Sequence, residues 1–87
     1  MPRHKITPDA ARDHQALGAA IQRLRDQAGV TQAELAARVG IGVPYVSQIE
    51  NGHRGVGWHT VTRILHALDA DLHQLADAIG ETSGETP

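Results

Sequence analysis

The chain has 87 residues and no cysteine, which bounds it to one domain and excludes disulfides and thiolate metal sites. It has no run of about 18 apolar residues and no apolar stretch at its start, so we expect a cytoplasmic protein without a membrane span or signal peptide. The net charge is −2, but residues 1–57 hold seven Lys and Arg against five Asp and Glu, whereas residues 58–87 hold one against five. Only the first of these two parts suits an anionic partner.

The fold is expected to be all-α. Strand-favouring aromatic residues are nearly absent, and no segment of useful length alternates apolar and polar residues with a period of two. Apolar residues recur instead with helical spacing in five segments. We therefore expect a five-helix domain over residues 13–80, a flexible tail over 81–87, and an N-terminal arm over 1–12 that is partly helical or not helical.

The first helix is marked by apolar residues on one face: Leu17, Ala20, Ile21, Leu24 and Ala28. Its start is open between two alternatives. Asp13 can cap it, or Thr7 can cap an earlier start that puts Pro8 at the first helical position. Gly29 is suited to end it.

The second helix has the clearest start. Thr31 followed by Glu34 is a capping-box pattern, and Val30 with Leu35 occupies the two positions of a hydrophobic staple. We expect this helix to end at Gly40, because a residue without Cβ permits the left-handed conformation of a tight turn.

The third helix is expected over residues 43–51, with Gly42 as its N-cap. Pro44 fits the first turn, where backbone amides have no intrahelical partner. Val46 and Ile49 are expected to face inward.

Two more helices follow, marked by Val61, Ile64, Leu65 and Leu68 in the fourth and by Leu72, Leu75, Ala76 and Ile79 in the fifth. The fifth begins at Asp71, with Gln74 at the reciprocal capping position.

The second and third helices have the spacing of a helix-turn-helix. Ala36 is small where the two helices would cross closely, and Gly40 turns the chain between them. The apolar wedge that would fix the crossing consists of Leu35, Val39, Ile41, Val46 and Ile49. A lone glycine between two helices would mean little, whereas this combination of offsets is specific.

At these positions the chain resembles the lambda-repressor-like family of phage and bacterial regulators, also called the Xre family. The matching residues are Arg25, Gly29, Thr31 to Ala36, Val39, Gly40, Val46, Ile49 to Gly52, Arg54 and Ile64 to Leu68. The resemblance covers about residues 15–80. It implies a five-helix lambda-repressor-like domain that binds double-stranded DNA as a homodimer on a near-palindromic operator, with the third helix in the major groove.

The resemblance also implies roles for individual residues. Family members touch base edges from the exposed face of the third helix, which here presents Val43, Pro44, Tyr45, Ser47 and Gln48. Gln32, Asn51 and Arg54 are similar to residues that contact DNA phosphates. Arg25 and Glu50 match a structural ion pair between the first and third helices.

The reading edge departs from the usual family pattern. Val43 and Pro44 offer only apolar surface, so they can pack on a thymine methyl but cannot hydrogen-bond a base. Gln48 can donate and accept together, which matches the N7 and N6 of adenine. We therefore expect adjacent A·T pairs under this helix. The loop over residues 55–58 replaces the usual Pro-Ser before the fourth helix.

A dimer interface is expected on the last helix, where Leu72, Leu75 and Ile79 form an apolar stripe. The alternative is that these residues close the core of the monomer. Arg3, His4 and Lys5 can form a flexible arm on the DNA backbone, or a disordered start.

No cofactor or metal is expected. His59, His66 and His73 recur every seven residues, and helical positions seven apart lie roughly 10 Å from each other, too far to share one zinc. The chain has no catalytic constellation, so we do not expect an enzyme.

The leading hypothesis is a stand-alone transcriptional regulator, a repressor, that acts at an operator. The alternative is an antitoxin of the same fold that binds a toxin and its own promoter.

Overall fold

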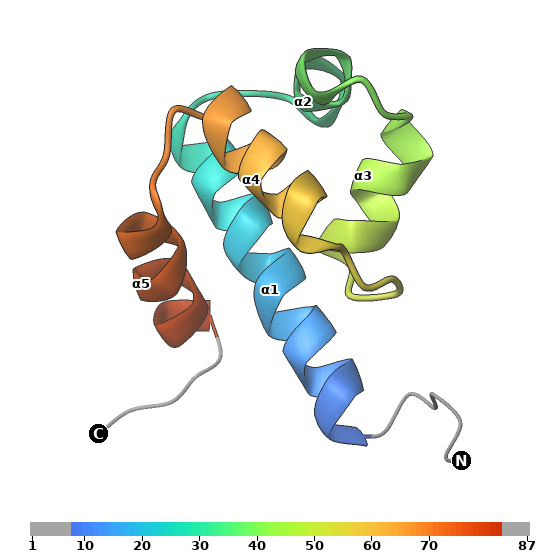
Figure 1. Cartoon of the computed structure of the whole chain (residues 1–87), viewed down its shortest axis with the longest axis vertical. Coiled ribbons are helices and arrows are strands. Elements are labelled where there is room, and N and C mark those ends of the chain that lie inside the picture. The colour runs from blue at the N-terminus through green and yellow to red at the C-terminus, as the bar shows by residue number, and fades with distance from the viewer. Residues whose placement is uncertain (1–7, 83–87) are drawn as a thin grey trace.

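The computed structural model describes residues 8–82, with side chains over 12–81, and within that range it contains five helices and no strand (Figure 1). The helices are α1 (Pro8–Gln27), α2 (Gln32–Val39), α3 (Val43–Glu50), α4 (Trp58–Ala67) and α5 (Leu72–Thr82). The expected all-α fold is confirmed. α1 is the long central helix with α5 and α3 on opposite sides, and α2 packs against α3 and α4 (Figure 1).

The two ends of the domain lie further out than the expected boundaries. α1 begins at Pro8, so the earlier of the two possible starts is the one adopted and residues 8–12 of the expected arm are helical. α5 continues to Thr82, two residues into the expected tail. Arg3, His4 and Lys5 of the arm, and residues 83–87 of the tail, lie outside the described residues.

The core is built from one apolar stripe on each helix. Its largest fully buried side chains are Ile21 from α1, Leu35 and Val39 from α2, Val46 and Ile49 from α3, and Ile64 from α4. α5 contributes Leu75 and Ala78. Each fully buried aliphatic side chain of this size favours folding by about 1.5–3 kcal/mol, so helices too short to be stable alone are held by tertiary packing.

The turn of the helix-turn-helix is formed as its residues dictate. Thr31 Oγ1 accepts from the Glu34 amide at 3.0 Å, and the Glu34 carboxylate accepts from the Thr31 amide at 2.8 Å, which completes the capping box. Gly40 ends α2 at φ +84°, and its amide donates to the Ala36 carbonyl at 2.8 Å. Because the left-handed region disfavours residues with a Cβ, glycine suits this turn.

α1 and α3 touch backbone to backbone at Gly18. A Cβ built on Gly18 would lie 2.0 Å from the carbonyl oxygen of Ile49 and 2.9 Å from that of Glu50. Only glycine allows this approach, which sets the position of the last turn of α3 against α1.

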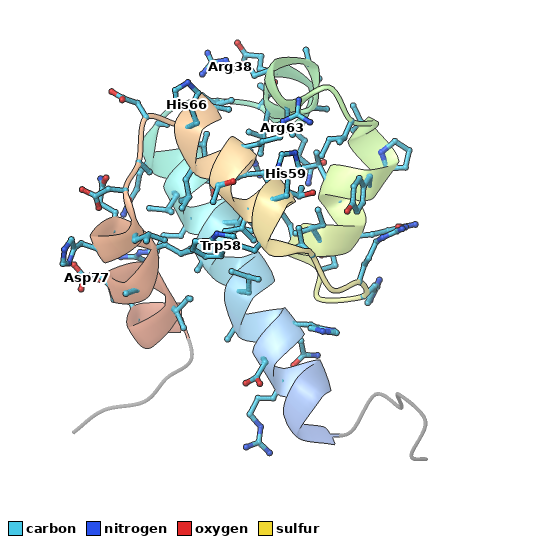
Figure 2. The ribbon with its side chains drawn as sticks, in the orientation of Figure 1. Arg38, Trp58, His59, Arg63, His66 and Asp77 are labelled. Atoms are coloured by element: carbon cyan, nitrogen blue, oxygen red, sulfur yellow. The ribbon has the colours of Figure 1, made fainter. Side chains whose placement is uncertain are left out.

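α2 and α4 are joined by two arginines, each of which donates to a backbone carbonyl at the C-terminal end of the other helix (Figure 2). Arg38 of α2 donates from Nη1 to the carbonyl of Ala67 at 3.0 Å, and Arg63 of α4 donates from Nη2 to the carbonyl of Val39. Carbonyls in a last helical turn lack intrahelical partners, and cations there also match the helix dipole. Each helix therefore caps the other.

Candidate nucleic-acid interface

α3 has one buried and one accessible face. The buried side chains are Val46, Ile49 and Glu50. The five residues predicted to read bases lie elsewhere on the helix: Val43, Pro44 and Gln48 are exposed, and Tyr45 and Ser47 are half-buried. The accessible face thus combines an apolar end at Val43, which is 41% exposed, with polar groups nearer the C-terminal end.

A buried ion pair ties α3 to α1. Arg25 and Glu50, the pair predicted from the family pattern, are only 8% and 5% exposed. Arg25 Nε donates to Glu50 Oε2 at 2.6 Å and Arg25 Nη2 to Oε1 at 3.0 Å, which is the bidentate geometry that suits a guanidinium and a carboxylate. Arg25 Nη1 also donates to the Val30 carbonyl at 2.8 Å. The hydrogen bond with Glu50 raises the pKa of Arg25 against the opposing effect of burial.

Gln32 joins the same carboxylate. Its Nε2 donates to Glu50 Oε1 at 2.9 Å, so Glu50 holds side chains from both α1 and α2. Gln32 was predicted to contact a phosphate, and its amide has a second N–H in addition to the one that Glu50 accepts. The network therefore orients Gln32 in the first turn of α2, where the helix dipole is positive.

Arg54, predicted as a phosphate contact, lies on the accessible face of α3, against two of the residues predicted to read bases. Its guanidinium carbon is 4.5 Å from the centroid of the Tyr45 ring, and its Nη1 donates to Gln48 Oε1 at 3.3 Å. Asn51 behaves similarly, since its Nδ2 donates to Ser47 Oγ at 3.3 Å. Asn51 and Arg54 thus both fold back onto side chains of that helix.

The loop after α3 is held close to α1 by two glycines. A Cβ on Gly52, at φ +73°, would lie 2.7 Å from the Cα of Gln15, and a Cβ on Gly55 would lie 2.8 Å from His14 Nε2. These approaches position Arg54 between the two glycines. The sequence analysis gave neither Gly18 nor Gly55 a role in packing. In the sequence, only the glycine residues themselves pointed to these close approaches, because Gly18 meets α3 and Gly55 meets α1 only in the folded protein.

The stripe predicted as a dimer interface is divided between core and surface. Leu75 is 6% exposed and Ile79 is half-buried against the core. Leu75 therefore belongs to the core of the monomer, which was the alternative to a role in the dimer interface. Leu72 is 51% exposed.

Trp58 is a surface residue that the sequence analysis did not single out. It is 63% exposed and begins α4 on the side that faces α5 (Figure 2). Trp58 and Leu72 both line a groove of about 500 Å³ between α4 and α5, together with Thr62, Leu65, His66, Ala70, Asp71 and His73.

Across residues 8–82, no three His, Asp or Glu side chains gather where they could hold a metal ion. None of the described helices is long and apolar enough to cross a membrane.

Comparisons with known proteins agree with this geometry. Residues 16–78 match the family model of the helix-turn-helix domain. The chain is 34% identical over 64 residues to the propionyl-CoA carboxylase regulator of Cereibacter sphaeroides, and the alignment covers 74% of this chain but only 14% of that protein. This chain therefore corresponds to about one-seventh of that relative's length.

Two solved structures share the fold at 30% sequence identity. The clp gene regulator ClgR of Corynebacterium glutamicum superposes with a TM-score of 0.77 over 82% of this chain and 91% of that one. The restriction-modification controller protein C.AhdI of Aeromonas hydrophila superposes with a TM-score of 0.68 over 72% of this chain and 96% of that one. These relatives are regulators and a controller protein by description. The chain belongs to the helix-turn-helix domain family, among the lambda-repressor-like (Xre) regulators that bind DNA and control transcription.

Proposed function

We propose that this chain is a sequence-specific repressor that binds a near-palindromic operator as a homodimer, with α3 in the major groove. One observation carries the proposal: α3 is anchored by Glu50 on its buried face, while Val43, Pro44 and Gln48 remain exposed on the other. Direct readout of base edges requires a helix that is held in position and that exposes both apolar and hydrogen-bonding side chains to the major groove. Acting on chromosomal DNA would put the protein in the cytoplasm of a bacterial cell.

The proposed contacts divide into two groups. Base edges are read by Val43, Pro44, Tyr45, Ser47 and Gln48, with the apolar end of the helix on a thymine methyl. Phosphates are contacted by Gln32, Asn51 and Arg54, which fix the position of the helix without themselves specifying sequence. The orientation of Gln32 by Glu50 supports the second group, because an ordered donor loses less conformational entropy on binding.

The proposed dimer uses the α4–α5 side. Leu72 and Trp58 are exposed there and line one groove, and removing such apolar surface from water favours association. In a two-fold dimer both copies use the same patch, and the two α3 helices would meet half-sites about one turn of DNA apart.

Selection of bound sites from random duplex DNA tests the function. We expect recovered sites to share two inverted half-sites centred about 10 base pairs apart. Gln48→Ala should cost roughly 1–3 kcal/mol on the selected site while the helical content stays that of the wild type. Recovery of no preferred sequence would contradict the proposal. The antitoxin alternative is not favoured by the relatives reported above, which are described as regulators or a controller protein.

A further inference from the structure

We infer that Arg54 determines which base Gln48 reads, and that α3 recognises guanine at the base pair opposite Gln48. The inference rests on the proposed function, since it concerns the same helix in the same groove. It replaces the adenine expected from Gln48 considered alone. The observation behind it is the contact of Arg54 with both Gln48 and Tyr45.

The first step is the orientation of the Gln48 amide. A guanidinium has five N–H donors and no acceptor, so the group of Gln48 that faces Arg54 must be the carbonyl oxygen. The 3.3 Å distance joins Arg54 Nη1 to Gln48 Oε1 accordingly. The NH2 group of the planar amide then lies on the other side of Gln48, which is exposed.

The second step is the match to a base. A glutamine that reads adenine uses both ends of its amide, because adenine offers the N7 acceptor and the N6 donor in the major groove. Oε1 keeps a second lone pair, but the cationic guanidinium of Arg54 lies beside it, so the N6 amino group of adenine would have to approach a group that itself offers only N–H donors. Guanine offers two acceptors there, N7 and O6. An edge formed by the N–H groups of Gln48 and Arg54 therefore favours the two acceptors of guanine and disfavours the N6 amino group of adenine.

The third step is what keeps Arg54 in place. Its guanidinium lies over the ring of Tyr45, a side chain one turn before Gln48 on α3. Tyr45 is half-buried, so the ring is a partly fixed platform. The carboxylate of Glu50, the acidic residue of α3, accepts from Arg25 and Gln32, which leaves Gln48 and Tyr45 as the partners of Arg54 on that helix.

The loop geometry is the fourth step. Arg54 lies between Gly52, which approaches the backbone of α1 at Gln15 too closely for a side chain, and Gly55, which lies against the imidazole of His14. The backbone that bears Arg54 is thereby packed against the domain. Arg54 can donate to Gln48 and still direct other N–H groups toward a phosphate, so the proposed phosphate contact is compatible with this role.

The test is a binding series over all four base pairs at every half-site position, for the wild type, Arg54→Ala, Gln48→Ala and the double variant. We expect the wild type to prefer G·C opposite Gln48 by about tenfold, within the range that a good pair of base contacts supplies. Arg54→Ala should shift the preference at that pair to A·T, because the freed oxygen of Gln48 can accept from N6. The double variant should show no preference there.

Control variants distinguish an effect of where Arg54 is held from a general effect of removing a positive charge. Arg23→Ala removes a positive charge on α1 that pairs with Glu81, and it should leave every base preference unchanged. Tyr45→Phe keeps the ring under Arg54, so loss of the hydroxyl can lower the affinity for all sites but should not change the ratio of guanine to adenine at the Gln48 pair. Tyr45→Ala removes the ring that holds Arg54 and should move the preference at that pair toward A·T, as Arg54→Ala does.

Two results would overturn the inference. In the first, the wild type prefers A·T opposite Gln48, or Arg54→Ala weakens all sequences equally without a change of preference. Arg54 is then a phosphate contact alone, and the proposed function stands. In the second, the wild type selects no sequence from random duplex DNA, and the inference fails together with the proposed function.

Discussion

At the scale of single residues, one carboxylate joins three helices. Glu50 of α3 accepts from Arg25 of α1 and from Gln32 of α2, and it is almost fully buried. Burying charges is costly unless they are paired and hydrogen-bonded, and here every buried polar side-chain atom among the described residues has a partner. The network therefore holds the reading helix in one orientation relative to the helix that supplies Gln32.

Removing one partner of this network should be more harmful than replacing the pair. Glu50→Ala removes the buried, bidentate partner of Arg25 and leaves as its counter-ion only the exposed carboxylate of Asp26, 3.3 Å from Arg25 Nη1, so we expect a loss of about 3–5 kcal/mol in the free energy of unfolding. The double variant Arg25→Met, Glu50→Leu leaves no unpaired charge and should lose less. Urea unfolding followed by circular dichroism measures both. A single variant as stable as the double one would show that the pair is not energetically coupled.

At the scale of elements, contacts between residues close in the sequence could be predicted, whereas contacts between helices could not. The capping pairs Thr31–Glu34 and Asp71–Gln74 were predictable because each is a contact between residues three apart. The role of Gly18 was not, because its constraint is a carbonyl of α3 that the tertiary fold brings against α1. For the same reason, the contact of Gln48 with Arg54 could not be predicted from α3 alone. The reading helix was predictable from the sequence, but the partners of its side chains were not.

The α1–α3 contact can be tested with two glycines in helices. Gly18→Ala places a methyl 2.0 Å from the Ile49 carbonyl oxygen, so we expect a loss of about 1–3 kcal/mol from overpacking. Gly80→Ala in α5 meets nothing within 4 Å and should stabilise the protein by about 0.5–1 kcal/mol, because alanine favours the helix. Thermal unfolding of the two variants gives opposite signs if the close approach is real. Equal shifts would mean that α1 and α3 can separate freely.

The capping box of α2 should make stability depend on pH. Hydrogen bonds from the backbone and side chain of Thr31 lower the pKa of Glu34 below its ordinary value. A carboxyl whose folded pKa is lowered contributes stability above its unfolded pKa, about 4.3, and loses it as the pH falls through the folded pKa. Glu34→Gln keeps a capping side chain that does not titrate.

Urea unfolding at pH 7 and pH 3 measures this contribution. The wild type should lose more stability than Glu34→Gln between the two pH values. The capping box of α5 is the control, because its N3 residue is already Gln74, and Gln74→Glu should add a loss of the same sign. Equal losses in the wild type and Glu34→Gln would contradict the prediction.

At the scale of the whole molecule, charge is divided between two sides. α5 carries Asp77 and Glu81 and is capped by Asp71, whereas Arg54 lies at the accessible face of α3. Figure 1 shows α5 and α3 on opposite sides of α1, so the acidic helix lies away from the face proposed for DNA. A net charge of −2 is thus compatible with an anionic partner, because the local sign of the surface governs the encounter.

The division of the molecule into a reading side and an apolar side leads to a prediction about assembly. Leu72→Ser and Trp58→Ser each remove exposed apolar surface from the α4–α5 groove, so the fold should be retained while self-association weakens. Leu75→Ala is the matched control, because Leu75 is buried in the monomer and its truncation should cost about 2–5 kcal/mol of folding stability.

Sedimentation measures the association of these variants, and titration of full and half operators measures the effect of association on DNA binding. We expect the surface variants to sediment as monomers at concentrations where the wild type is a dimer, and to bind a full operator little better than a half-site. A wild type that is monomeric both free and on a full operator would exclude the dimer. A surface variant that still dimerises would place the interface away from this groove.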